Sequence, residues 1–408
     1  MKVLHTSDWH LGKRLLHHER TEEHQHFLNW LLETIRTEKV DVLVVAGDIF
    51  DTGAPANTAL KQYYDFLREL HFTGCKNVII TGGNHDSIST LNAPKELLKY
   101  FNIHVIGGVP ENLEDEIITV KNAAGEVGLV VCAVPFLRDK DIRLSIAGET
   151  TEEREQRLKD GICAHYKNLV PLISEYKTAG IPVLATGHLF AAGSSTSDSE
   201  KEIHVGNLGQ ICGDQFPEEF DYIALGHLHR PQIVGGFNHV RYSGSPIPLS
   251  FSENDDRKSI LLLNFAQGKL SDLTEVPVPR QRRLVRFKGT LDKVQVHLLA
   301  FENQDCPLPA WAEVQIETES FIPNLEENLR ELLGDKTELE LVRCLQVRLT
   351  PKITLDAQVK EDLHLHDLQP KEVFRKRCEA ELPDLIHDDL LQTFDELLEN
   401  MGGHKINN

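Results

Sequence analysis

The chain has 408 residues, 40% of them apolar, which is enough for two or three domains with cores of their own. It contains no run of about 18 apolar residues, so the sequence excludes an apolar membrane-spanning helix. A net charge of −20 disfavours a broadly basic nucleic-acid-binding protein, so any contact with DNA must come from local basic patches, metal ions or a partner subunit.

The seven cysteines are scattered through the chain and never form a C-x-x-C pair. This pattern indicates reduced thiols and argues against a thiolate metal site. The N-terminal residues enter a strand-like run directly and lack the layout of a signal peptide. We therefore expect a cytoplasmic protein.

Apolar runs typical of strands alternate with helical patterns over the first hundred residues. Strands are expected at 3–7, 40–46 and 78–81, and helices at 21–38, 55–70 and 92–101. The run at 40–46 is almost continuously apolar, as in a strand that is buried on both faces. Short strands then dominate up to residue 276, apart from one long helical stretch at 152–177. The pattern predicts an α/β fold.

A segment rich in proline, 277–280, indicates a linker after this region. A small α+β unit is expected at 280–350, followed by helices at 352–400. The second half of these helices has apolar residues at steps of three and four on an otherwise acidic surface. Such a stripe favours burial in a groove of another protein, and packing back on the preceding unit is the alternative.

Polar side chains follow five of the apolar runs, at the point where each strand should end. The stretch Val78–Thr81, for example, stops at two glycines and continues with Asn84 and His85. The complete set is Asp8, His10, Asp48, Asn84, His85, His188, His227 and His229. A lone histidine near a strand end is more often structural, but this set contains only oxygen and nitrogen ligands, as a site for two divalent metal ions requires.

These residues carry a family resemblance. The order and spacing of Asp8-x-His10, Gly47-Asp48-x-x-Asp51, Gly83-Asn84-His85-Asp86, Gly187-His188 and Gly226-His227-x-His229 resemble the five motifs of the calcineurin-like metallophosphoesterases over about residues 1–270. The sequences around the motifs, 5–12, 45–51 and 241–246, resemble those of the SbcD-like nuclease subunits of that superfamily.

The resemblance implies a metallophosphoesterase-type β-sandwich flanked by helices at 1–276, a capping domain at 280–350, and C-terminal helices at 352–400 that bind an ATPase partner. It also implies two metal ions, usually Mn²⁺. Asp8, His10 and His229 would hold the first ion and Asn84, His188 and His227 the second, with Asp48 bridging them. His85 would be the catalytic histidine and Asp51 a carboxylate that orients it. Asp86 is expected to be a turn residue that supports the ligands rather than a ligand itself.

The implied activity is cleavage of DNA phosphodiester bonds, as an exonuclease on double-stranded ends and an endonuclease on single strands and hairpins, in repair, recombination and replication. The implied partners are DNA, an SbcC-type coiled-coil ATPase, and a second copy of the chain bound through helices near 55–70 and 92–101. Leu67 and Leu98 are expected to be outward apolar positions of these helices, and the alternative is that such residues face the core of their own domain.

Two basic segments, 13–20 and 280–288, are candidates for DNA contact, and the second reads equally well as a solvated linker. A stand-alone metallophosphoesterase acting on small phosphodiesters or phosphoproteins is the alternative function, and an inactive scaffold is a third. The complete ligand set argues against the scaffold, and the long extension after residue 276 argues against a minimal phosphatase.

Overall fold

The computed structural model describes residues 1–142, 148–191, 193–195, 211–304 and 306–348, together with scattered positions between 371 and 397. Met1–Glu317 and Ile322–Val347 form one compact unit, and Thr318–Phe321 with Arg348–Asn408 form a second. In the second unit the described positions between 371 and 397 are helical, and the rings of Phe374 and Phe394 stack 4.1 Å apart. Most of the predicted helical segment 352–400 lies outside the described residues.

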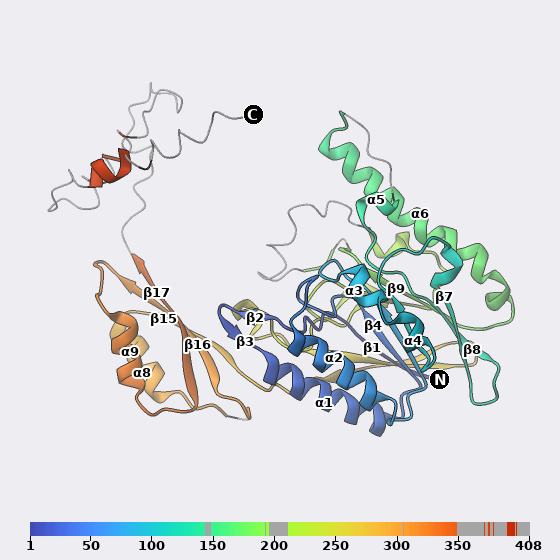
Figure 1. The fold of residues 1–408 in the computed structure, drawn as a ribbon, viewed down its shortest axis with the longest axis horizontal. Helices are drawn as coiled ribbons and strands as arrows, with labels where there is room; N and C mark the ends of the chain where they lie inside the picture. The colour runs from blue at the N-terminus through green and yellow to red at the C-terminus, as the bar shows by residue number, and fades with distance from the viewer. Residues whose placement is uncertain are drawn as a thin grey trace. The chain divides into compact units, whose positions relative to one another are not determined.

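The first unit contains two six-stranded sheets (Figure 1). The first has the order β14 (Lys269–Pro277), β13 (Ser259–Ala266), β1 (Lys2–Thr6), β4 (Val42–Ala46), β5 (Asn77–Thr81) and β6 (Ile103–Ile106). The second has the order β11 (Gln232–Val234), β12 (Phe237–Tyr242), β10 (Tyr222–Gly226), β9 (Val183–His188), β8 (Val127–Cys132) and β7 (Ile117–Lys121). The strand β1 runs parallel to β4 but antiparallel to β13, with Lys2 opposite Asn264.

The two sheets pack face to face around a shared apolar core. Val44 of β4 lies in this core with Leu184 of β9 and Ala224 of β10. A second core lies between the first sheet and the helices α1 (Thr21–Glu38) and α2 (Asn57–Leu70), and a third lies between the second sheet and α6 (Thr151–Thr178). The expected sandwich with flanking helices is therefore present, and β4 is buried on both faces as its apolar run predicted.

The expected helix at 92–101 is instead two short helices, α3 (Ile88–Asn92) and α4 (Lys95–Lys99). Pro94 separates them, because proline has no backbone N–H to donate to the carbonyl four residues earlier and so cannot continue the first helix. Leu67 of α2 and Leu98 of α4 were expected to face outward, but both are buried in the core under the first sheet. The apolar face of an amphipathic helix covers its own sheet first, which explains why this prediction was wrong.

The three-stranded sheet β15-β16-β17 forms its own small core with two helices. Its elements are β15 (Leu284–Gly289), α8 (Leu291–Ala300), β16 (Ala310–Thr318), α9 (Leu325–Leu333) and β17 (Leu339–Arg348). We call residues 280–347 the cap. Leu284 and Trp311 of the cap pack against Leu15, which lies in the hairpin of β2 (Arg14–Leu15) and β3 (His18–Glu19).

Three arginines of the basic segment 280–288 have partners within the protein, so the segment is not simply a solvated linker. Arg282 lies 3.6 Å from Glu23, and its guanidinium stacks over the ring of Trp311, 4.3 Å from the centroid. Arg286 pairs with Glu313, and Arg280 donates to the carbonyl of Asn254 at 2.6 Å.

No helix in the described part of the chain combines the length and apolar character needed to cross a bilayer.

Candidate active site

The site lies where parallel strands of both sheets end. β1, β4 and β5 are parallel neighbours in the first sheet, and β9 and β10 are parallel neighbours in the second. The carboxyl ends of parallel strands meet at one edge of a sheet, which is where α/β proteins place their sites. Each of these five strands leads directly into one of the predicted motifs, so the topology brings five distant segments of the sequence together.

Three glycines allow these strand ends to approach each other closely. A Cβ atom on Gly226 would lie 1.8 Å from the carbonyl oxygen of Ala46, and one on Gly47 would lie 2.1 Å from Nδ1 of His188. A Cβ atom on Gly83 would lie 2.1 Å from Oδ1 of Asp48. A larger residue at Gly47 or Gly226 would push the strand ends of the two sheets apart, and one at Gly83 would displace Asp48 within the first sheet.

Four of the predicted ligands have left-handed backbone conformations. Asp8, His10, Asp48 and His227 have φ angles of 53°, 47°, 50° and 100°. Asp and His adopt this region more readily than most residues, but it is still sparsely populated and costs about 1–3 kcal/mol per residue. Strain of this kind persists only where the surrounding structure fixes the backbone, and it collects at functional sites.

The structure brings Asp8, His10 and His229 together. Each of the three offers a ligand atom within 4.8 Å of the others, and all three are buried. Asp8 accepts hydrogen bonds from the hydroxyl of Ser7 at 2.5 Å and from the main-chain N–H of His227 at 2.8 Å. We call these three residues group one.

The second cluster contains Asp48, His188, Asn84 and His227. Asp8, Asp48 and His188 offer atoms within 4.8 Å of one another. Oδ1 of Asn84 lies 2.9 Å from Nε2 of His188 and 3.0 Å from Nδ1 of His227. Nδ1 of His188 donates to the carbonyl of Ala46 at 3.1 Å, so its Nε2 is the atom that faces Asn84. We call Asn84, His188 and His227 group two, with Asp48 between the groups, 3.5 Å from Nε2 of His10 and 3.3 Å from Nε2 of His188.

His85 lies next to group one, with its ring 4.8 Å from that of His10. Its Nδ1 donates to the main-chain carbonyl of Asp51 at 2.8 Å. We expected the carboxylate of Asp51 to orient His85, but that carboxylate lies 3.2 Å from Nδ1 of His10 and 3.1 Å from Nζ of Lys13. The hydrogen-bond partner of His85 is therefore the main-chain carbonyl of Asp51, while an oxygen of the Asp51 carboxylate lies within 4.8 Å of a ring nitrogen of His85 and of one of His10.

Two supporting groups were not found from the sequence. Glu253 is fully buried, with Oε1 at 3.5 Å from Nδ1 of His229, and Lys258 donates to the carbonyl of His229 at 2.8 Å. Neither residue belongs to a motif. Their burial as a charge pair distinguishes them from other charged residues, and the sequence does not show this burial. Asp86, expected as a turn residue, accepts three main-chain N–H groups, from Gly83 at 2.9 Å, Ile49 at 3.1 Å and Phe50 at 3.0 Å.

Burial dominates the electrostatics of the site. It raises the pKa of Asp8 to about 8 and lowers that of His10 to about 4. Burial would also lower the pKa of His188, but the adjacent Asp48 carboxylate raises it to about 9. His10 is therefore neutral near pH 7 and keeps a lone pair, and a cation beside Asp8 would favour the ionised carboxylate.

The donor set fits divalent metal ions. Nε2 of His10 and Nε2 of His85 are buried and have no hydrogen-bond partner among the described residues. Leaving a buried polar atom unsatisfied costs about 1–3 kcal/mol, which a ligand that binds the atom would relieve. Carboxylate, amide and imidazole groups suit Mn²⁺, Fe²⁺ or Zn²⁺ better than soft metals.

Comparisons with known proteins agree with this geometry. A family model described as calcineurin-like phosphoesterase matches residues 1–231, and one described as type 5 capsule protein repressor C-terminal domain matches residues 280–381. The chain is 37% identical over 399 residues to the SbcD subunit of the nuclease SbcCD from Escherichia coli (strain K12), and the match covers 96% of both chains. It is 34% identical to the protein of the same name from Rhodobacter capsulatus, over 70% of this chain and 71% of that one. The Bacillus subtilis protein of that name is 32% identical, over 78% of this chain and 79% of that one. The chain therefore belongs to the SbcD family of calcineurin-like phosphoesterases.

Proposed function

We propose that this protein is the nuclease subunit of a DNA-end-processing complex that hydrolyses phosphodiester bonds in DNA with the help of two divalent metal ions. The relatives carry the name of the SbcD component of the nuclease SbcCD. The observation that carries the proposal is the gathering of two ligand groups around Asp48 at the ends of five strands. The expected reactions are exonuclease cleavage at double-stranded ends and endonuclease cleavage of single strands and hairpins.

Asp8, His10 and His229 would hold one ion and Asn84, His188 and His227 the other, with Asp48 shared between them. The proposed metal is Mn²⁺, the ion that the family resemblance implies, and the oxygen and nitrogen donors are compatible with it. When bound, two such ions neutralise the charge of the phosphodiester and activate water for attack. In the protein, Asp51 and Ala46 accept from Nδ1 of His85 and His188, and these contacts fix the two imidazole rings.

His85 is the proposed general acid. Because its Nδ1 donates to the carbonyl of Asp51, its Nε2 is the atom that would deliver a proton to the leaving oxygen or hydrogen-bond to the phosphate. Asp51 holds His10 through its carboxylate and His85 through its carbonyl, so it would position both rings. Lys13, a quarter exposed beside Asp51, is the basic group of segment 13–20 best placed for a phosphate.

The proposed organisation comprises a nuclease domain at 1–276, a capping domain at 280–350, and a segment at 352–400 that binds an SbcC-type ATPase. The family model for the C-terminal region, which matches 280–381, supports treating the last two parts as features of this family. The ATPase would supply the basic DNA surface that a chain of net charge −20 lacks.

A second copy of the chain is proposed to dock on an exposed aromatic patch. The patch surrounds the ends of α2 and α4, and its members are Phe72, Leu97, Tyr100 and Phe101, with 50–87% of each residue exposed. The rings of Phe72 and Phe101 lie 5.4 Å and 5.9 Å from that of His71. Contiguous exposed aromatic residues of this kind mark protein interaction sites.

The decisive experiment measures cleavage by the purified protein with Mn²⁺, on duplex ends, hairpins, single strands and a chromogenic phosphodiester. Cleavage of DNA that stops with EDTA and returns with Mn²⁺ is the expected result. Hydrolysis of the chromogenic ester without any cleavage of DNA would favour the stand-alone phosphoesterase instead.

A further inference from the structure

The protein holds His188 of group two differently from the two histidines of group one. In group two, Nδ1 of His188 donates to the main-chain carbonyl of Ala46 in the centre of the first sheet. In group one, both histidines are held by carboxylates, His10 by Asp51 at 3.2 Å and His229 by Glu253 at 3.5 Å. A carbonyl in a central strand is held in place by the hydrogen bonds of the sheet. A carboxylate outside the strands depends on the contacts of its own loop or turn.

Glu253 lies in a short 3₁₀ turn, Phe251–Glu253, that the cap covers. The ring of Phe251 packs against Leu284 and Trp311 of the cap. Within the same turn, Glu253 accepts from Lys258 at 2.7 Å and from the main-chain N–H of Leu249 at 3.0 Å. Lys258 also donates to the carbonyl of His229 at 2.8 Å. Glu253 therefore holds the ring of His229, and Lys258 holds its main chain. Glu253 is two residues after Phe251, which contacts the cap.

The other carboxylate of group one also lies beside a cap contact. Asp51 pairs with Lys13, and Lys13 is two residues before Leu15, which packs in the same apolar cluster as Trp311. His18 of this hairpin lies 3.5 Å from Glu340 on β17 of the cap, and its ring lies 5.2 Å from that of Trp311. The cap thus touches the turn that carries Glu253 and the hairpin that follows Lys13, the residue that pairs with Asp51.

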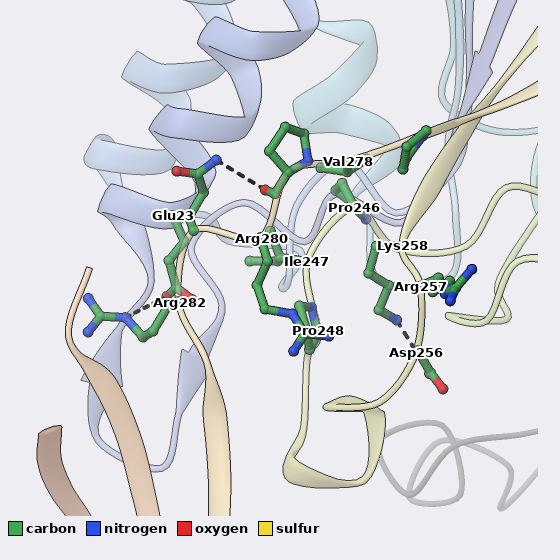
Figure 2. Close-up of a pocket in the computed structure, with 13 residues that line it drawn as sticks. Glu23, Pro246, Ile247, Pro248, Asp256, Arg257, Lys258, Val278, Arg280 and Arg282 are labelled. Atoms are coloured by element: carbon green, nitrogen blue, oxygen red, sulfur yellow. Dashed lines mark hydrogen bonds and ion pairs between the residues drawn. The ribbon is translucent and has the colours of Figure 1, made fainter. Parts of the chain in front are cut away.

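Contacts around the segment 277–282 also join the cap to the rest of the unit. The segment 277–282 borders a cavity of about 180 Å³, and in Figure 2 Arg282 points toward Glu23 while Lys258 points toward Asp256. Arg282 is held by Glu23 and Trp311, and Arg20 donates to Glu23 at 2.9 Å. The apolar cluster around Trp311 and the ion pairs of Arg282 are therefore among the contacts that link the cap to the part of the unit that carries the site.

We propose that Glu253 is a positioning residue through which the cap controls metal binding at group one and leaves group two unaffected. This inference rests on the proposed two-metal function. It assigns the cap a regulatory role, in which displacement of the cap loosens His229 and empties one of the two metal positions. β17, which carries Glu340, continues directly into the residues proposed to bind the ATPase, so that partner could act on the metal site through the cap.

The test uses two backgrounds that each retain one ligand group. His188→Ala keeps group one, and His229→Ala keeps group two. Glu253→Gln is introduced into each, and Mn²⁺ affinity is measured by calorimetry and by electron paramagnetic resonance of free Mn²⁺. Loss of the partner of a metal-binding histidine lowers metal affinity by about 10- to 100-fold, and we expect this loss in the His188→Ala background only. Glu275→Gln, which removes an exposed carboxylate paired with Arg241, is the matched control and should leave the Mn²⁺ affinity unchanged in both backgrounds.

The role of the cap is tested with Phe251→Ala and Trp311→Ala in the same backgrounds, with the exposed cap variant Leu299→Ala as control. Both should weaken Mn²⁺ binding by group one and spare group two, with thermal unfolding used to show that each variant is folded. If Glu253→Gln lowered Mn²⁺ affinity equally in both backgrounds, or in neither, the proposed role of Glu253 would be overturned. A selective effect of Glu253→Gln without any effect of the two cap variants would overturn control by the cap. Wild-type protein that binds two Mn²⁺ ions but cleaves no DNA would refute the nuclease function alone.

Discussion

Replacement of Asp86 by alanine should destabilise the whole edge that carries the site. Its carboxylate is buried and accepts the N–H groups of Gly83, Ile49 and Phe50 at 2.9–3.1 Å. These donors belong to the loops after β4 and β5, so a single side chain ties together the segments that present Asp48 and His85.

The magnitude follows from the three donors. A buried N–H left without a partner costs about 1–3 kcal/mol, which gives an upper range of about 3–9 kcal/mol for three. Burial raises the pKa of Asp86 to about 6, which shows that holding its charge is itself unfavourable, and water can enter the space left by the carboxylate. We therefore expect a loss of about 3 kcal/mol in the free energy of unfolding, at the low end of that range.

The assay is urea-induced unfolding of the metal-free protein, followed by Mn²⁺ titration of the folded variant. Asp115→Ala, at an exposed position, is the control and should stay within about 0.5 kcal/mol of the parent protein. The loss of unfolding free energy in Asp86→Asn should lie between those of Asp86→Ala and Asp115→Ala, because the asparagine side chain keeps one acceptor oxygen. An Asp86→Ala protein with unchanged unfolding midpoint and unchanged Mn²⁺ affinity would refute the view that this carboxylate organises the two loops.

Three further predictions concern chemistry and assembly. His85→Ala should retain two Mn²⁺ ions while cleavage falls at least about 100-fold, whereas Asp48→Ala should lose metal, and loss of metal from the first variant would place His85 among the ligands instead. Phe72→Glu combined with Tyr100→Glu should give monomers in analytical ultracentrifugation, and an unchanged mass would exclude the patch near α2 and α4. Deletion of 352–408 should abolish binding to the ATPase partner while Mn²⁺-dependent cleavage of single strands persists, and co-purification at full affinity would contradict this.

The sequence predicted those features of the site that depend on strand order. Asp8, Asp48, Asn84, His188 and His227 each follow an apolar run, and parallel strands carry such residues to a common edge. The contacts of Glu253 and Lys258 could not be predicted, because they depend on how the chain turns after β12 and on which loop the cap covers.

The outward face of a helix was also beyond prediction. The periodicity of the sequence shows that α2 has an apolar side, but tertiary packing decides whether that side faces its own sheet or another protein. Leu67 was expected to face outward, and it lies in the core. The same limitation explains the basic segment 280–288. Its partners Glu23, Asn254 and Glu313 are distant in sequence, and only the fold brings them to Arg282, Arg280 and Arg286.

The pairing of β1 with β13 has a consequence for synthesis on the ribosome. Lys2 is opposite Asn264, so one edge of the first strand stays open until about 260 more residues have been made. At the usual elongation rates of about 5–20 residues per second, this interval is roughly 10–50 s. Throughout this interval the unpaired edge of β1, a strand that is buried in the finished protein, stays exposed, and we expect the nascent chain to depend on chaperones until β13 emerges and completes the sheet.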